Sequence, residues 1–145
     1  MANISGNELV AETLHRIGIT DLFFIMGGPI NGVLTRTMKK GIRGIDVRHE
    51  QAAAMSAHAY ARVTNKPGLC MGASGPGSVN LTTGLANALI DSSQNVPFGG
   101  SNPVHEYFTG AFQEIDHIPG MTPDTKDINQ GEETTPNTCK MGSPI

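Results

Sequence analysis

The sequence predicts an α/β fold: a mostly parallel sheet with helices on both faces, in the three-layer, doubly wound arrangement. Short apolar runs alternate along the chain with longer stretches of helical periodicity. Strands that alternate with helices in this way are joined by right-handed crossovers into a parallel sheet. Glycine-rich turns such as Gly27-Gly28 and Gly75-Pro76-Gly77 stand where a strand gives way to a helix. Because ligands on such sheets bind beyond the carboxyl ends of the strands, we expect these turns to face a ligand.

The first third of the chain indicates a helix, a strand and a second helix. Residues 5–8 form a capping box, and the helix that follows them stops at Gly18. The apolar run 22–25 is uninterrupted, which suits a strand covered on both faces. A second helix is predicted from Pro29 to about Lys40. The apolar positions of the first helix are Leu9, Val10, Leu14 and Ile17.

The same pattern continues to about residue 118. The alanine-rich stretch 50–63 predicts a third long helix. From about Pro119 onward polar residues follow one another without periodicity. We therefore expect one domain at 1–118 and, at 119–145, an irregular tail that is disordered or lies outside the family pattern. The other predicted elements are strands at 45–47, 69–71 and, more weakly, 96–98, and a helix whose inner face carries Leu81, Leu85, Ala88 and Leu89.

Composition excludes several classes of partner. The chain has 145 residues, a net charge of −3 and scattered basic residues, so we expect no nucleic-acid partner. No apolar run approaches the roughly 20 residues of a membrane span, and acidic residues occupy the N-terminal stretch where a signal peptide would be basic. Cys70 and Cys139 belong to no metal-spaced cluster. A cytoplasmic chain without membrane contact and without metal ligands of its own is expected.

Two interpretations of the glycine turns stay open on the residues alone. A strand, Gly75-Pro76-Gly77 and a helix could cradle a phosphate. A dinucleotide fingerprint, however, needs a third glycine where Asn80 stands, and a P-loop needs a Gly-Lys-Ser/Thr ending. The alternative is structural: the turns let helices pack closely on strands, and Glu50 is an acidic residue favoured at a helix N-terminus.

A set of linked motifs carries a family resemblance. Val-Arg-His-Glu-Gln-Ala-Ala-Ala at 47–54 is followed by Ala-Tyr-Ala-Arg at 59–62, Lys-Pro-Gly at 66–68 and Ser-Gly-Pro-Gly at 74–77, with Asn80 beyond them. Thr-Gly-Leu-Ala-Asn-Ala at 83–88 and Ala-Phe-Gln-Glu-Ile-Asp at 111–116 extend the pattern. The order and spacing resemble the N-terminal pyrimidine-binding domain of thiamine diphosphate enzymes of the acetolactate synthase type. Oxalyl-CoA decarboxylase and the 2-hydroxyacyl-CoA lyases belong to the same group.

The resemblance implies a thiamine diphosphate-dependent lyase or transferase that makes or breaks a C–C bond next to a carbonyl. In this family the glutamate matching Glu50 bonds N1' of the aminopyrimidine and promotes the imino tautomer that removes the C2 proton. Desolvation favours a protonated carboxyl group, so we expect Glu50 to be largely buried in the assembled site. His49 is expected to have a structural hydrogen-bonding role. The implied catalytic residues are Glu50 and Gln113, and the implied cofactor-binding residues are Gly27, Gly28, Glu50, Ser74, Asn80, Phe112 and Gln113.

The substrate class stays open. Phe24 and Met26 replace the glycine and proline usual in acetolactate synthases. Gly99-Gly100-Ser101 and the segment 110–114 are more similar to the acyl-CoA branch. A small 2-ketoacid or an acyl-CoA is therefore the expected substrate, with a 2-hydroxyacyl-CoA lyase or oxalyl-CoA decarboxylase as the alternative reading.

The family's diphosphate-binding half does not appear in this sequence. In the family a Gly-Asp-Gly motif and a downstream asparagine hold Mg²⁺ and the diphosphate, and the cofactor site forms between two subunits. We therefore expect the isolated chain to be inactive and to need a second copy or a diphosphate-binding domain or subunit. We expect the chain to be a fragment of a longer enzyme; a pyrimidine-domain subunit of a split decarboxylase, like that of sulfopyruvate decarboxylase, and a non-catalytic dimerisation module are the alternatives. The polar stretch 93–97 is expected to interrupt an apolar strand, as a sequence error would.

Overall fold

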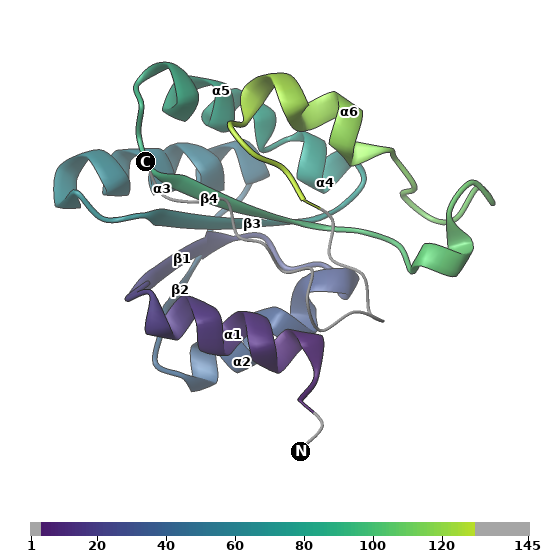
Figure 1. Cartoon of the computed structure of the whole chain (residues 1–145), viewed down its shortest axis with the longest axis horizontal. Coiled ribbons are helices and arrows are strands. Elements are labelled where there is room, and N and C mark those ends of the chain that lie inside the picture. Colours follow the sequence, from purple (N-terminus) through teal and green to yellow (C-terminus); the bar gives the residue numbers. More distant parts are fainter. Residues whose placement is uncertain (1–3, 130–145) are drawn as a thin grey trace.

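A four-stranded parallel sheet forms the centre of the protein (Figure 1). The computed structural model describes residues 4–129. The strand order is β2-β1-β3-β4, and every neighbouring pair is parallel. Both the α/β class and the mostly parallel sheet are thus confirmed. The strands are β1 (Asp21–Phe24), β2 (Arg43–Asp46), β3 (Gly68–Ser74) and β4 (Asn95–Gly100).

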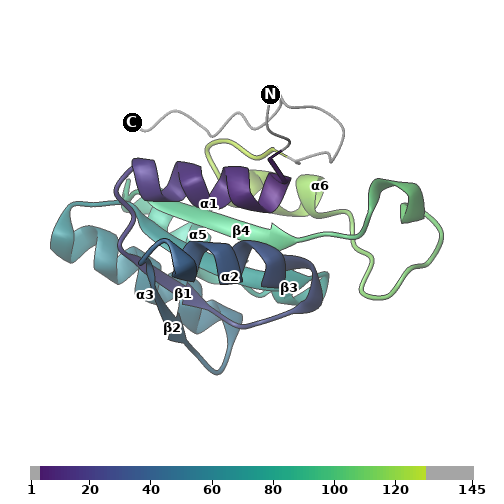
Figure 2. The ribbon, with the colours of Figure 1, turned by 90° about the horizontal axis from the view of Figure 1, so that it is seen from below.

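Helices cover both faces of this sheet, which confirms the three-layer arrangement. In Figure 1 α1 and α2 lie below the strands, while α3, α5 and α6 lie above them. Figure 2, seen from below, shows α1 and α2 in front of the strands. The α-helices are α1 (Gly6–Arg16), α2 (Asn31–Lys39), α3 (Glu50–Thr64), α4 (Pro76–Val79), α5 (Thr82–Ile90) and α6 (His117–Met121), and the 3₁₀ helices are η1 (Gly28–Ile30), η2 (Val104–Glu106) and η3 (Thr122–Asp124).

Each face of the sheet has its own hydrophobic core. Successive residues of a strand point to opposite faces, so Leu69 and Met71 of β3 enter the core under α1 and α2, whereas Cys70 enters the core under α3 and α5. Burial raises the pKa of the Cys70 thiol to about 12, so the thiol stays protonated. The second core is built on small residues of α3, including Ala53, Ala54 and Ala57, which let α5 approach closely.

The helix ends are largely where the sequence places them. The Ser5 hydroxyl accepts a hydrogen bond from the Glu8 N–H at 3.3 Å, and Gly18 follows α1 with a φ of +83°. Gly41 ends the second helical segment with a φ of +88°. That segment begins at Gly28, one residue before the predicted Pro29, as the 3₁₀ helix η1 and becomes α-helical only at Asn31.

Two predictions about the second half of the domain are wrong. The predicted helix is present as α5, and Leu81, Leu85 and Ala88 are buried, but Leu89 on its predicted inner face is 40 % exposed; the glycine turn itself forms the separate short helix α4. The polar stretch 93–97 does not interrupt the fourth strand, because β4 begins at Asn95 and pairs with β3. The Asn95 side chain donates to the Ala54 carbonyl oxygen at 3.1 Å, so its amide joins β4 to α3.

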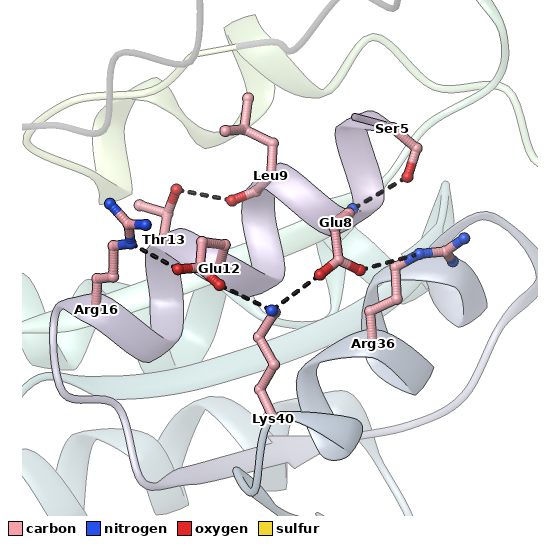
Figure 3. Close-up of polar contacts among 8 residues, drawn as sticks. All are labelled: Ser5, Glu8, Leu9, Glu12, Thr13, Arg16, Arg36 and Lys40. Carbon is pink, nitrogen blue, oxygen red and sulfur yellow. Dashed lines mark hydrogen bonds and ion pairs between the residues drawn. The ribbon is translucent and has the colours of Figure 1, made fainter. Parts of the chain in front are cut away.

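Ion pairs join the two helices on the α1–α2 face (Figure 3). The Lys40 ammonium lies 2.9 Å from a Glu8 oxygen and 2.8 Å from a Glu12 oxygen. Arg16, one turn further along α1, bonds the other Glu12 oxygen at 2.6 Å. The hydrogen bond from Lys40, and after it that from Arg16, holds the pKa of the Glu12 carboxyl at about 2.

The chain beyond β4 leaves the sheet and then returns to it. The loop that contains η2 projects past the carboxyl end of β4 in both views (Figures 1 and 2). The following α6 brings Met121 into the core under α3 and α5, and Ile128 packs against the same core. The short helix therefore crosses the predicted boundary at 118, and the residues of the predicted tail beyond 129 lie outside the described part of the chain. No helix within residues 4–129 has the length and apolar character needed to cross a membrane.

Candidate functional site

The strand order creates a switch point between β1 and β3. The chain passes from β1 outward to β2 and, after crossing back through α3, from β3 outward to β4. Connections that leave two adjacent strands in opposite directions open a crevice at their carboxyl ends, where ligands of doubly wound folds bind. Gly27 follows β1 at this edge and Ser74 ends β3. The predicted site residues therefore come from segments that meet at this edge.

Glu50 and Asn80 contact each other at the N-terminus of α3. Glu50 is the first residue of α3, directly after the segment that leaves β2, and its side chain is half-buried. The Asn80 side-chain amide, placed by α4, donates a hydrogen bond of 3.0 Å to Oε2 of Glu50. His49 lies outside this contact: its Nδ1 accepts the Gln51 N–H at 3.2 Å and caps the helix, which confirms the structural role expected for it.

Gly77 leaves space beside the second oxygen of Glu50. A Cβ placed on Gly77 would lie 3.2 Å from Oε1 of Glu50 and 3.0 Å from the Ala73 Cβ. Both distances are shorter than ordinary van der Waals contact, so a side chain here would crowd the carboxylate. One oxygen of Glu50 is thus held by Asn80, and the other faces a position without a side chain.

Ser74 and Gln113 form a second contact at the same edge. The Ser74 hydroxyl donates to Oε1 of Gln113 at 2.9 Å, across 39 residues of sequence. Gln113 has a φ of 56°, and Gly75, next to Ser74, has a φ of +57°. A Cβ on Gly75 would lie 2.9 Å from the Gln113 carbonyl carbon, so the loop that carries Gln113 packs directly on the glycine turn.

The other predicted residues have different surroundings. Gly27 packs against Ala73, where a Cβ would collide with the alanine side chain. Gly28 begins η1, and no heavy atom lies within 4 Å of the place a Cβ would take. Phe112 precedes Gln113 on the loop but is 82 % exposed. The structure therefore pairs Glu50 with Asn80 and Ser74 with Gln113, and leaves Gly28 and Phe112 without such contacts.

Three further residues shape this edge and were not predicted as site residues. Gly77 was recognised only as part of the glycine turn. Ala73 separates Gly27 from Gly77 and carries no signal in the sequence, because a single alanine has no polar group or motif that marks it as a site residue. Glu114 accepts the backbone N–H groups of the loop that contains Gln113. Its position directly after the Phe112-Gln113 pair is the signal that could have found it.

No cluster of three or more His, Cys, Asp or Glu side chains that could hold a metal ion occurs within residues 4–129. Two surface hollows lie at the amino ends of the strands. One is lined by residues of 61–66 and 91–94, the other by residues of 15–20 and 40–42. Neither contains a predicted site residue, so polar contacts at the carboxyl edge define the candidate site.

Comparison with known proteins identifies the family of this chain. Residues 4–119 match the family described as "Thiamine pyrophosphate enzyme, N-terminal TPP binding domain". The chain belongs to this family. The match ends at the third residue of α6, and it includes every predicted site residue.

Relatives of the TPP-enzyme domain include enzymes of both branches considered above. A 2-hydroxyacyl-CoA lyase of Arabidopsis thaliana is 40 % identical over 80 % of this chain and 20 % of its own length. The chloroplastic acetolactate synthase 2 of Nicotiana tabacum is 44 % identical over 75 % of this chain and 17 % of its own length. The acetolactate synthase isozyme 2 large subunit of Escherichia coli is 42 % identical over 78 % of this chain and 21 % of its own length. The chain thus spans about a fifth of the relatives it matches.

Proposed function

We propose that this chain is the cofactor-activating domain of a thiamine diphosphate enzyme that makes or breaks a C–C bond next to a carbonyl. Glu50 is the activating residue in this proposal. The observation that carries it is the placement of the Glu50 carboxylate at the switch point, with one oxygen bonded by Asn80 and the other beside Gly77. A side-chain-free surface next to a half-buried carboxylate fits the edge of a flat heteroaromatic ring.

Glu50 has one chemical task in this scheme. Thiamine diphosphate, when bound, supplies the nucleophilic carbon and the electron sink of the reaction. The Glu50 carboxyl group would hold or release a proton at Oε1, the oxygen beside Gly77, for a ring nitrogen of the bound cofactor. Asn80 orients the carboxylate through Oε2 and leaves Oε1 for the ligand. Such a proton transfer is efficient when donor and acceptor are held within hydrogen-bond reach.

Gln113 and Ser74 supply the second polar contact of the proposed site. The Gln113 oxygen is bonded by Ser74, so the direction of its side-chain NH₂ group is fixed. That NH₂ group is free to donate to a substrate or cofactor oxygen at the carboxyl edge. The exposed Phe112 would add an apolar wall once a second polypeptide covers it.

We propose that a diphosphate-binding domain completes the site. The chain spans about a fifth of its relatives, and no metal-binding cluster occurs within residues 4–129. A diphosphate-binding domain, in a second copy or a second subunit, would hold Mg²⁺ and the diphosphate. The isolated chain is accordingly proposed to be inactive, and a cytoplasmic location remains our prediction.

Three other assignments have support of their own. The 40 % identity to a 2-hydroxyacyl-CoA lyase supports an acyl-CoA substrate and the lyase or oxalyl-CoA decarboxylase branch. A 2-ketoacid is supported by the acetolactate synthase relatives. A non-catalytic dimerisation module is supported by exposed apolar side chains, Phe108 and Phe112 among them. The pyrimidine-domain subunit of a split decarboxylase would have the same site as our main proposal.

Calorimetry with thiamine diphosphate and Mg²⁺ tests the proposal. The chain is titrated alone and then with a diphosphate-binding domain taken from the Escherichia coli acetolactate synthase. We expect binding only in the mixture. Tight binding by the chain alone would overturn the need for a partner, and no heat in either titration would favour the dimerisation module.

Proton exchange at C2 of the cofactor, followed by NMR in the mixture, tests the role of Glu50. Glu50→Gln keeps the size of the side chain and removes its proton-transfer capacity, so exchange is expected to slow by a factor on the order of 10² or more. The matched control is Asp46→Asn, which changes an exposed carboxylate of β2 that pairs with Arg48. If the C2 proton exchanged as fast with the Glu50→Gln chain as with the unmodified chain, the assignment would be refuted.

A further inference from the structure

We infer that Glu114 is a positioning residue: its carboxylate holds the segment 108–114 in the conformation that brings Gln113 to Ser74. The inference rests on the proposed function only in one respect, namely that Gln113 contacts the substrate or cofactor. The contacts themselves are properties of this chain, and they place three backbone N–H groups around one carboxylate.

The Glu114 carboxylate is the centre of the loop. One oxygen accepts the backbone N–H of Phe108, and the other accepts those of Gly110 at 2.8 Å and Ala111 at 3.0 Å. These N–H bonds, that of Phe108 first, hold the pKa of the Glu114 carboxyl below its ordinary value. Hydrogen bonds to an ionised acceptor are roughly twice as strong as neutral ones, so the charge contributes to holding the loop.

The backbone of the loop needs such a restraint. Phe108, Gly110 and Gln113 have φ angles of 62°, 75° and 56°. A side-chain-bearing residue in this left-handed region is strained, and the strain persists only where surrounding contacts impose it. Without the Glu114 carboxylate, Phe108 and Gln113 would relax toward negative φ. A change of φ at Gln113 would swing its side chain away from Ser74.

The remaining contacts of the loop include the Thr109 hydroxyl, which donates to the Glu106 carbonyl oxygen at 2.6 Å. The Ser101 and Tyr107 hydroxyl groups are 2.6 Å apart, and the Asn102 side chain donates to the Phe112 carbonyl oxygen at 3.1 Å. All of these contacts are between uncharged groups. Glu114 therefore provides the charged acceptor that joins residues 108, 110 and 111 to the residue that follows Gln113.

The charged groups around the loop do not compete for Glu114. His105 and Glu106 lie on η2 and face each other at 3.8 Å, and Asp116 precedes α6. No ion pair within residues 4–129 includes Glu114. A pH dependence of the loop contacts can thus be assigned to Glu114 once Glu106 has been replaced as a control.

NMR of the full, ¹⁵N-labelled chain tests this inference without any cofactor. The amide protons of Phe108, Gly110 and Ala111 are expected to shift together as the pH falls through the lowered pKa of Glu114. In Glu114→Gln this shared step disappears, amide exchange of the three residues accelerates on the order of tenfold, and the Ser74–Gln113 nuclear Overhauser effect is lost. Glu114→Asp, which keeps the charge on a shorter side chain, should restore the step.

Two further variants separate positioning from general loss of structure. Glu106→Gln removes a neighbouring carboxylate that bonds no loop amide, so the pH step and the Ser74–Gln113 contact should remain. Gly75→Ala displaces the Gln113 backbone directly and should abolish the Ser74–Gln113 contact while leaving the three N–H bonds to Glu114 in place. Amide signals of α3 report whether each variant is folded. An intact Ser74–Gln113 contact in a folded Glu114→Gln chain would overturn the inference.

The outcome is independent of the calorimetry. If the unmodified chain and its partner domain bind no thiamine diphosphate, the proposed function is refuted. The NMR experiments then still test whether Glu114 positions Gln113. If cofactor binds and the Glu114→Gln loop is unchanged, the function survives and the positioning role is refuted.

Discussion

The side-chain amide of Asn80 donates a hydrogen bond to the Glu50 carboxylate across 3.0 Å, and this bond joins the segment after α4 to the first residue of α3. The two residues are 30 positions apart in sequence. The bond provides a hydrogen-bond donor to a half-buried carboxylate oxygen, which without Asn80 would depend on water at the edge of the sheet. It therefore contributes to the stability of the fold as well as to the geometry of the site.

Asn80→Ala should destabilise the domain measurably. The substitution removes the donor and leaves the Glu50 oxygen without its partner, and hydrogen bonds to charged groups contribute about 1.5–3 kcal/mol when buried. Because Glu50 is half-exposed, we expect a loss below this range, about 1 kcal/mol. Urea unfolding followed by circular dichroism measures it. Asn87→Ala on the exposed side of α5 is the control and should stay within about 0.5 kcal/mol; an equal loss in both variants would show that the bond has no specific contribution.

Gly84→Ala should destabilise the contact between α3 and α5. A Cβ at position 84 would lie 2.5 Å from the Ala54 Cβ and 2.8 Å from the Ala54 carbonyl carbon, both in the core. Alanine gains about 1 kcal/mol in helix propensity over glycine, but overpacking of a core costs about 1–3 kcal/mol. We expect a net lower free energy of unfolding, because the close contact includes backbone that cannot move aside.

Gly6→Ala provides the matched comparison for Gly84→Ala. Gly6 begins α1, and no heavy atom lies within 4 Å of a Cβ placed there. The propensity gain is then unopposed, and the free energy of unfolding should stay equal or rise slightly. A stabilised Gly84→Ala chain would show that the two helices separate easily and that the small residues of α3 are not needed for packing.

Much of the fold could be predicted from local patterns. The apolar run 22–25, the alanine-rich stretch 50–63 and the glycine stops at Gly18 and Gly41 depend on neighbours in sequence, and the structure has elements at each of these places. The exposure of Leu89 could not be predicted from helical spacing alone: Leu85 and Ala88 of α5 are buried, whereas Leu89, one residue before the end of the helix at Ile90, is 40 % exposed. Likewise Asn95 looked like an interruption, and only its bond to the Ala54 carbonyl explains its place in a strand.

The candidate site could be predicted as a set of residues but not as a geometry. Motif order selected Glu50, Asn80, Ser74 and Gln113, whereas the pairing of Ser74 with Gln113 depends on a loop that crosses back over the sheet edge. That loop contains two non-glycine residues at positive φ, Phe108 and Gln113, which sequence preferences do not predict. The three backbone N–H groups that donate to Glu114 account for these two conformations, and this contact is visible only in the structure.

Lys40→Met should remove a pH-dependent part of the stability on the α1–α2 face. Lys40 bonds both Glu8 and Glu12, and its hydrogen bond is the largest cause that holds the Glu12 pKa at about 2 (Figure 3). The unfolded chain has Glu12 near its ordinary pKa of about 4.3, so the unfolded state binds this proton more tightly. The ion pair therefore stabilises the fold fully above about pH 4.3, and this contribution declines as the pH falls toward about 2.

Urea midpoints measured between pH 2 and 7 check the Lys40 prediction. The difference between the unmodified chain and Lys40→Met should be constant near neutral pH and should shrink progressively below about pH 4.3, because protonated Glu12 no longer attracts the ammonium. High salt should reduce the same difference, since the groups are solvent-accessible and screened. Lys39→Met changes the neighbouring exposed lysine, which forms no ion pair within residues 4–129, and should leave the pH profile as it is. A difference for Lys40→Met that persists unchanged at pH 2 would mean that the methylene stem of Lys40, and not its charge, joins the helices.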